Sequence, residues 1–127
     1  MRVLLDTHLL IWALRDDAAL PRSGRSAILS STAVFVSMAS FWEIAIKASI
    51  GKLKLDLDGL PGAVRRAGFD VLPIDLPHVQ RVRSLPHYHR DPFDRMLVAQ
   101  AGAEELLLLT SDGTLQAYGG DVVRVVR

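Results

Sequence analysis

The strongest constraint on the fold is an alternation of short apolar runs with longer amphipathic segments. The runs predict strands at residues 2–6, 33–37, 69–74, 106–110 and 122–126. They are rich in Leu and Val and lack regular polar alternation, which is typical of strands covered on both faces of a parallel sheet. The remaining segments predict helices near residues 8–14, 22–31, 40–50, 58–67, 76–84 and 92–103, with a short helix after residue 113.

This alternation predicts a three-layer α/β/α sandwich around a five-stranded, mostly parallel sheet. Half of the 127 residues are apolar, and no repeat or linker divides them, so we expect a single domain over residues 1–127. The absence of cysteine excludes a thiolate metal site and a disulfide framework. No apolar stretch reaches the length of a membrane span, so we expect a soluble cytoplasmic protein.

The charge balance excludes the overall basic character that is typical of many nucleic-acid-binding proteins. Fifteen Lys and Arg residues stand against fourteen Asp and Glu residues. Any surface that binds nucleic acid must therefore be local.

Acidic residues recur at the predicted carboxyl ends of strands and at helix starts on the same edge. The four positions are the end of the first strand, the helix after the second, the start of the helix before the fourth, and the turn after the fourth: Asp6, Glu43, Asp94 and Asp112. In open parallel sheets the functional crevice lies beyond this edge. We therefore expect the four carboxylates to meet.

Each acid also has a structural interpretation. Asp6 is suited to cap the helix that follows it, and Asp112 with Gly113 is an ordinary turn pair. Glu43 completes a capping box with Ser40 in the stretch "SFWE". These local patterns explain each acid alone, but they do not predict that all four gather at one edge beside serine and threonine hydroxyls.

The stretch "HYHRDPFDRMLVAQA", residues 87–101, contains two aspartates three positions apart. Asp91 is a good N-cap before Pro92, and Asp94 falls in the first turn, where the helix dipole favours an acid. Helix initiation therefore explains this stretch locally. We expect His87 and His89, two apart in the preceding loop, to be polar surface residues and not zinc ligands.

Four gathered carboxylates require a compensating charge. Two like charges about 4 Å apart repel by roughly 4 kcal/mol at an effective dielectric constant of about 20. An oxygen-only site without cysteine suits Mg²⁺ or Mn²⁺ better than Zn²⁺. Such ions can generate hydroxide and align it with a phosphorus atom. The residues therefore predict metal-dependent phosphodiester hydrolysis.

Motifs spread over essentially the whole chain resemble those of PIN-domain ribonucleases, in particular the VapC-type toxins of bacterial toxin–antitoxin pairs. The motifs are "LLDTHLLIW", "SFWEIAIKASIGKLKL", "LPHYHRDPFDRMLVAQA", "LLTSD" and "YGGDVVRV". The resemblance implies that Asp6, Glu43, Asp94 and Asp112 are the catalytic acids that bind Mg²⁺ or Mn²⁺. Asp91 is then a cap or a supporting residue.

The resemblance further implies supporting residues. Thr7 and Thr110 match positions where a hydroxyl orients an acid or a metal-bound water. Arg90 and Arg95 flank the third acid and are expected to hold RNA phosphates. We expect His8 to lie near the site without being required for catalysis.

The resemblance also implies partners: an RNA substrate, a cognate antitoxin and a second copy of the chain in a homodimer. Large apolar side chains such as Trp12, Phe41 and Trp42 lie on helices beside the predicted site. We expect most of them to pack in the core, and we expect an antitoxin to lay an apolar segment along this region.

Other protein classes fit the sequence less well. A haloacid-dehalogenase-type phosphatase requires a second aspartate at the position of His8. A response-regulator receiver requires a lysine after the fifth strand, and no such lysine precedes Arg127. A catalytically silent α/β binding module, whose acids act only as caps, remains the alternative. Manganese binding that is lost when Asp6 is neutralised would distinguish the nuclease from this module.

Overall fold

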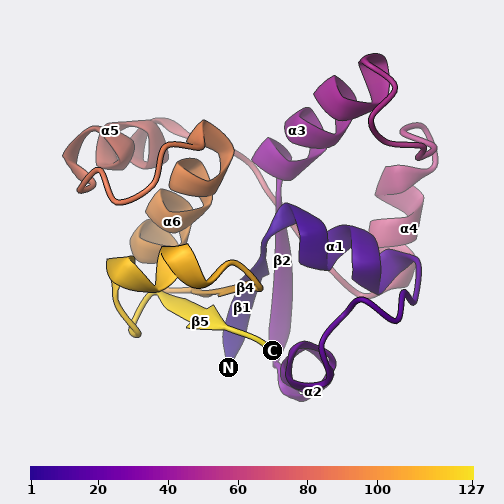
Figure 1. Cartoon of the computed structure of the whole chain (residues 1–127), viewed down its shortest axis with the longest axis horizontal. Coiled ribbons are helices and arrows are strands. Elements are labelled where there is room, and N and C mark those ends of the chain that lie inside the picture. Colours follow the sequence, from indigo (N-terminus) through magenta and orange to yellow (C-terminus); the bar gives the residue numbers. More distant parts are fainter.

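A computed structural model describes residues 1–127 and contains a central sheet flanked by helices (Figure 1). The strands are β1 (Arg2–Leu5), β2 (Ala33–Ser37), β3 (Asp70–Leu72), β4 (Leu107–Thr110) and β5 (Val123–Val125). The helices are α1 (Thr7–Leu14), α2 (Arg22–Ser30), α3 (Met38–Ser49), α4 (Leu60–Arg66), α5 (Leu76–Ser84), α6 (Pro92–Glu104) and the 3₁₀ helix η1 (Gly113–Tyr118). None of the helices has the length and apolar character needed to cross a bilayer.

The sheet confirms the predicted fold class. Its strand order is β3-β2-β1-β4-β5, and all four neighbouring pairs are parallel. The chain builds outward from β1 to β3 on one side and then crosses to β4 on the other side. The direction of strand order therefore reverses between β1 and β4, and the carboxyl ends of these two strands flank the expected crevice.

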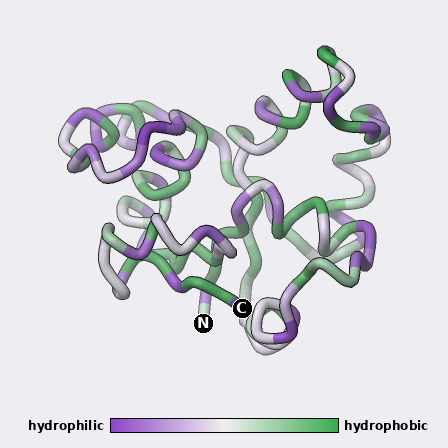
Figure 2. The backbone as a smooth tube through the Cα atoms, viewed as in Figure 1, coloured by the Kyte–Doolittle hydropathy of each residue, from purple (hydrophilic) through white to green (hydrophobic).

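Alternate residues of the central strand face two separate apolar layers. Val3 and Leu5 of β1 pack in the layer that includes α1, α2 and α4, whereas Leu4 packs in the layer that includes α6 and η1. All three side chains are fully buried. In Figure 2 the central strands are mostly hydrophobic and the hydrophilic residues gather on the outer helices and loops. Burial on both faces explains why the strand sequences lack polar alternation.

The start of α3 differs from the prediction. The helix begins at Met38, and Ser37 caps it by accepting a hydrogen bond from the Ala39 N–H (2.9 Å). Ser40 and Glu43 therefore lie inside the helix, and the predicted capping box between them is wrong. The cap moves because β2 runs directly into α3 at Ser37, which leaves no turn between strand and helix.

A small polar network lies inside the apolar layer below α6. Gln100 is fully buried. Its Oε1 accepts a hydrogen bond from the Ser37 hydroxyl (2.5 Å), and its Nε2 donates to the Pro73 carbonyl (3.3 Å). The amide thus links α6 to the last residue of β2 and to the segment that follows β3. Satisfied polar groups of this kind fix a unique arrangement of elements.

Candidate functional site

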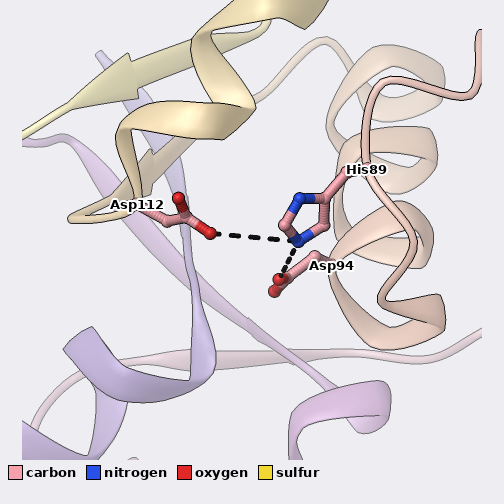
Figure 3. A group of neighbouring side chains, drawn as sticks. All are labelled: His89, Asp94 and Asp112. Atoms are coloured by element: carbon pink, nitrogen blue, oxygen red, sulfur yellow. Dashed lines mark hydrogen bonds and ion pairs between the residues drawn. The ribbon is translucent and has the colours of Figure 1, made fainter.

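Three side chains from separate segments converge at the carboxyl edge of the sheet (Figure 3). Asp94 lies in the first turn of α6, Asp112 caps η1 after β4, and His89 belongs to the loop before α6. The His89 Nε2 atom lies 2.8 Å from Asp94 Oδ2 and 3.9 Å from Asp112 Oδ2. One ligand atom from each residue lies within 4.8 Å of the others, so the group is compact enough to hold a metal ion.

Asp112 is fixed by its neighbour Thr114. The Thr114 N–H and hydroxyl both donate to Asp112 Oδ1, at 2.9 and 2.7 Å. These hydrogen bonds, the hydroxyl first, hold the pKa of the Asp112 carboxyl below its usual value. Asp112 is therefore ionised near neutral pH, and its other oxygen faces His89.

Asp94 is an acid in an unfavourable place for a negative charge. Burial raises its pKa from 3.8 to about 6, and the neighbouring charge of Asp91 adds to the effect. The hydrogen bond shared with His89 lowers the pKa of Asp94 but does not cancel the increase. The Asp94 carboxylate therefore gains more than an ordinary surface acid from a nearby cation.

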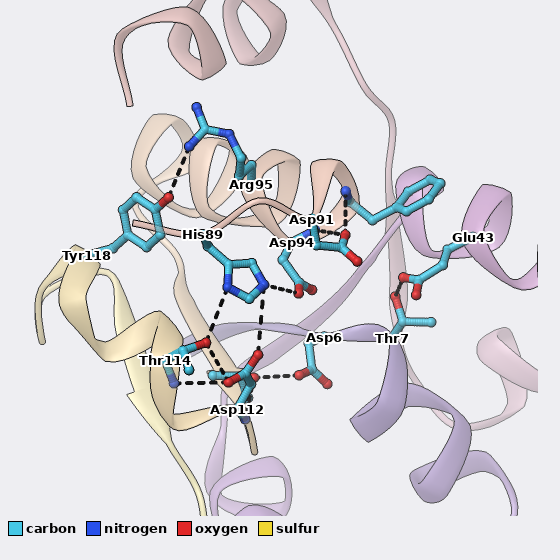
Figure 4. Close-up of polar contacts among 12 residues, drawn as sticks. Asp6, Thr7, Glu43, His89, Asp91, Asp94, Arg95, Asp112, Thr114 and Tyr118 are labelled. Carbon is cyan, nitrogen blue, oxygen red and sulfur yellow. Dashed lines mark hydrogen bonds and ion pairs between the residues drawn. The ribbon is translucent and has the colours of Figure 1, made fainter. Parts of the chain in front are cut away.

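Asp6 lies at the centre of the edge, between β1 and β4 (Figure 4). Its side chain is buried, and it caps α1 by accepting from the Leu9 N–H (2.8 Å). Its second oxygen accepts from the Thr110 hydroxyl (2.6 Å), which itself accepts from the Asp112 N–H (3.0 Å). Burial raises the pKa of Asp6 in spite of these hydrogen bonds. A continuous hydrogen-bond chain thus joins the ends of the two strands.

Glu43 lies at the periphery of the acidic site. The Thr7 hydroxyl donates to Glu43 Oε1 (2.7 Å), and Lys47 Nζ lies 2.7 Å from Glu43 Oε2. Ser40 Oγ lies 2.9 Å from the same threonine hydroxyl. Both carboxylate oxygens therefore have partners within the protein. The charge of Glu43 is still close enough to contribute to the raised pKa of Asp6.

The four predicted acids lie at one edge of the sheet, but not equally close together. Asp94 and Asp112 belong to the compact group, and Asp6 lies close enough to raise the pKa of Asp94. Glu43 lies further out, where the Thr7 hydroxyl donates to it and its charge raises the pKa of Asp6. The expectation that His89 is a polar surface residue is corrected: its side chain is only 18% exposed and lies against Asp94. A loop histidine carries no periodic signal that would have indicated this. Its only sequence hint is its position two residues before the cap of α6.

The residues expected to support the acids lie in contact with them or with the helix that carries them. Thr110 and Thr7 each donate a hydroxyl to one of the acids, Asp6 and Glu43. Asp91 caps α6, accepting at one oxygen from the Phe93 N–H (2.8 Å) and the Asp94 N–H (3.1 Å). It initiates the helix that carries Asp94.

Arg95 does not face the solvent, as an RNA-binding side chain would. It is only 8% exposed, and its guanidinium donates to the carbonyls of Pro86 (2.9 Å) and Val82 (3.2 Å) and to the Tyr118 hydroxyl (3.1 Å). The expectation that Arg95 holds RNA is therefore corrected: its side chain fastens α5 and the loop after it to α6. Figure 4 shows its contact with Tyr118. Arg90 is exposed, as expected.

The donor set suits a hard divalent cation. Asp6, Asp94 and Asp112 offer carboxylate oxygens, the ligands that Mg²⁺ and Mn²⁺ prefer. Burial raises the pKa of Asp6 and of Asp94, so their negative charges are unfavourable in the protein alone. An ion at this edge would offset that charge, so the residues present fit such a metal.

Comparisons with known proteins agree with this architecture. Residues 3–121 match the family model described as PIN domain. No curated protein sequence matches the chain. VapBC2 from Rickettsia felis bound to a promoter DNA fragment is similar in fold, with a TM-score of 0.71 and 12% identity over 100% of both chains.

Two further structures are similar in the same way. DNA-bound VapBC from Salmonella typhimurium has a TM-score of 0.67 and 17% identity over 98% of both chains. A toxin–antitoxin complex from Klebsiella pneumoniae has a TM-score of 0.67 and 17% identity over 97% of this chain and 96% of that chain. At these identities the likeness concerns the fold.

Proposed function

This chain belongs to the PIN domain family, and from that membership and the geometry of the site we propose that it is a metal-dependent endoribonuclease. The observation that carries the proposal is the gathering of Asp6, Asp94 and Asp112 between the ends of β1 and β4, with raised pKa values at Asp6 and Asp94. If these acids served only as helix caps, they would not need to lie close together. We propose that residues 1–127 form a single nuclease domain.

The proposed catalytic and metal-binding acids are Asp6, Glu43, Asp94 and Asp112. Bound Mg²⁺ or Mn²⁺ would supply a nucleophilic hydroxide at neutral pH and stabilise charge on the leaving oxygen. Thr110 and Thr114 fix the directions of the Asp6 and Asp112 carboxylates.

The remaining residues position these acids and the substrate. Thr7 and Lys47 hold Glu43 at the margin of the site. Asp91 starts the helix that carries Asp94, and the exposed Arg90 lies beside it to contact an RNA phosphate. The chain thus supplies orientation and binding around the reacting phosphodiester.

We propose that the biological role is that of a VapC-type toxin whose cognate antitoxin covers this site. The similar folds include toxin–antitoxin complexes. Along α3 and at its C-cap, apolar side chains four positions apart remain 40–60% exposed: Met38, Trp42, Ile46 and Ile50. Phe41 and Trp12 instead pack against the core, as expected for most of the large apolar residues. The exposed stripe begins beside the acids and suits an apolar antitoxin segment.

The nuclease proposal is tested by incubating the purified protein with a labelled RNA pool in Mn²⁺ or Mg²⁺. We expect cleavage that stops when a chelator is added and that is absent from Asp6→Asn. If wild-type protein neither cleaves RNA nor binds Mn²⁺, the chain is better described as the silent binding module.

A homodimer is also proposed, and sedimentation tests it. We expect the purified protein to sediment at twice the mass of one chain. A strict monomer at high concentration would contradict the dimer.

A further inference from the structure

We propose that His89 is a nitrogen ligand of the metal ion, and that it makes the site prefer Mn²⁺ over Mg²⁺. This inference rests on the proposed metal-dependent function and adds a ligand to the four acids. Two contacts fix the imidazole ring, one at each of its nitrogen atoms.

The position of the ring proton follows from Thr114. The Thr114 hydroxyl has one hydrogen, which it donates to Asp112 Oδ1 at 2.7 Å. Toward His89 Nδ1, 3.2 Å away, the same oxygen can only accept. Nδ1 therefore carries the hydrogen, and in the neutral ring Nε2 presents a lone pair. This is the tautomer that binds a metal through Nε2, with the second nitrogen held by a neighbouring oxygen.

The lone pair points into the compact group of acids. His89 Nε2 lies 2.8 Å from Asp94 Oδ2, so two electron-rich atoms face each other at hydrogen-bond distance. A positive species must lie between them, either a proton or a metal ion. Figure 3 shows the ring edge directed at both carboxylates. A proton shared in this way holds the ring in place without the ion, and the proposed metal ion would take the place of that proton.

The separations match those of ligands around one ion. At metal–ligand bonds of about 2.1 Å, adjacent octahedral ligands are roughly 3 Å apart and opposite ones roughly 4.2 Å apart. The two distances from Nε2 to the carboxylates, 2.8 and 3.9 Å, fall close to this range. The His89 side chain is 18% exposed, so the ring is held largely by protein contacts.

A nitrogen ligand changes which ion the site favours. Carboxylates and water suit both Mg²⁺ and Mn²⁺, whereas imidazole suits the transition metals. Mg²⁺ also gives up its water shell reluctantly. One imidazole added to Asp94 and Asp112 therefore shifts the preference toward Mn²⁺.

Pulsed electron paramagnetic resonance of bound Mn²⁺ tests the assignment directly. We expect wild-type protein to show coupling between the electron spin and a ¹⁴N nucleus, and His89→Gln to lose it while still binding Mn²⁺ more weakly. The ratio of Mn²⁺ to Mg²⁺ affinity, measured by competition, should fall at least about tenfold. His87→Gln, an exposed residue of the same loop, and His8→Gln, an exposed residue next to Asp6, should keep the coupling.

The outcomes separate this inference from the proposed function. Bound Mn²⁺ without nitrogen coupling, or with coupling that disappears in His8→Gln and persists in His89→Gln, overturns the role of His89 and leaves the metal-dependent nuclease intact. Wild-type protein that binds no Mn²⁺ overturns both. Thermal melting of each variant shows whether a lost signal reflects unfolding, and the wild-type spectrum tests the proposal without any variant.

Discussion

Replacing Asp94 by asparagine is expected to lower the rate of RNA cleavage by more than about 100-fold while the fold persists. Loss of a residue that merely supports a metal ligand typically costs 10- to 100-fold, so loss of a ligand carboxylate should cost more. Asparagine keeps the size of the side chain but removes the charge that would hold the ion. The measurement is the initial rate of cleavage in saturating Mn²⁺.

Asp91 provides a matched control three residues away. Asp91→Asn removes the same charge from the same end of α6, but asparagine also caps helices, so cleavage should change by less than about threefold. Circular dichroism of both variants should match that of the wild type. If Asp91→Asn were as inactive as Asp94→Asn, the assignment of the metal-binding acid in this stretch would be wrong.

The second large effect concerns stability without metal. The pKa of Asp94 is about 6 in the folded chain against an ordinary 3.8, so the folded state binds this proton more tightly than the unfolded state. The contribution to stability is fully present below about pH 4 and is lost as the pH rises through about 6. The difference between the two pKa values corresponds to roughly 3 kcal/mol. Asp94→Asn should remove this dependence.

Urea unfolding in the presence of a chelator measures the effect. We expect Asp94→Asn to be more stable than the wild type at pH 7.5, by up to roughly 3 kcal/mol, and to differ little near pH 4. Comparing the two proteins at each pH removes the contribution of the other acids. Mn²⁺ should raise the stability of the wild type at pH 7.5 more than that of the variant. An equal difference at both pH values would falsify the link to Asp94.

Most helices and strands could be predicted from the sequence, because the hydrophobic periodicity and the length of each segment indicate its type. Buried strands such as residues 33–37 and amphipathic segments such as residues 76–84 begin and end as predicted. The start of α3 did not, because Ser37 and Ser40 are both good caps. Only the direct passage of β2 into the helix decides between them.

The site was predictable where it depends on strand ends and not where it depends on a loop. The position of Asp6 and Asp112 follows from the sheet, since parallel strands end at a common edge. The approach of His89 depends on how the segment before α6 folds back, and no periodicity encodes that path. The role expected for Arg95 was wrong for the same reason: its acceptors are the Val82 carbonyl in the last turn of α5 and the Pro86 carbonyl in the loop after it, and tertiary structure sets their positions.

The buried amide of Gln100 has a consequence for the mechanics of the site. Gln100 and Asp94 lie on one helix, six residues or roughly 9 Å apart. If α6 slid along its axis by one turn, the Gln100 amide would remain in an apolar layer but lose its partners Ser37 and Pro73. Leaving the amide without hydrogen bonds would lower the stability of the fold by about 1–3 kcal/mol. The buried hydrogen bonds of Gln100 therefore oppose any sliding of α6 along its axis. These buried contacts therefore fix the position of Asp94 relative to the other carboxylates. Neither substrate nor partner can reach the contacts themselves.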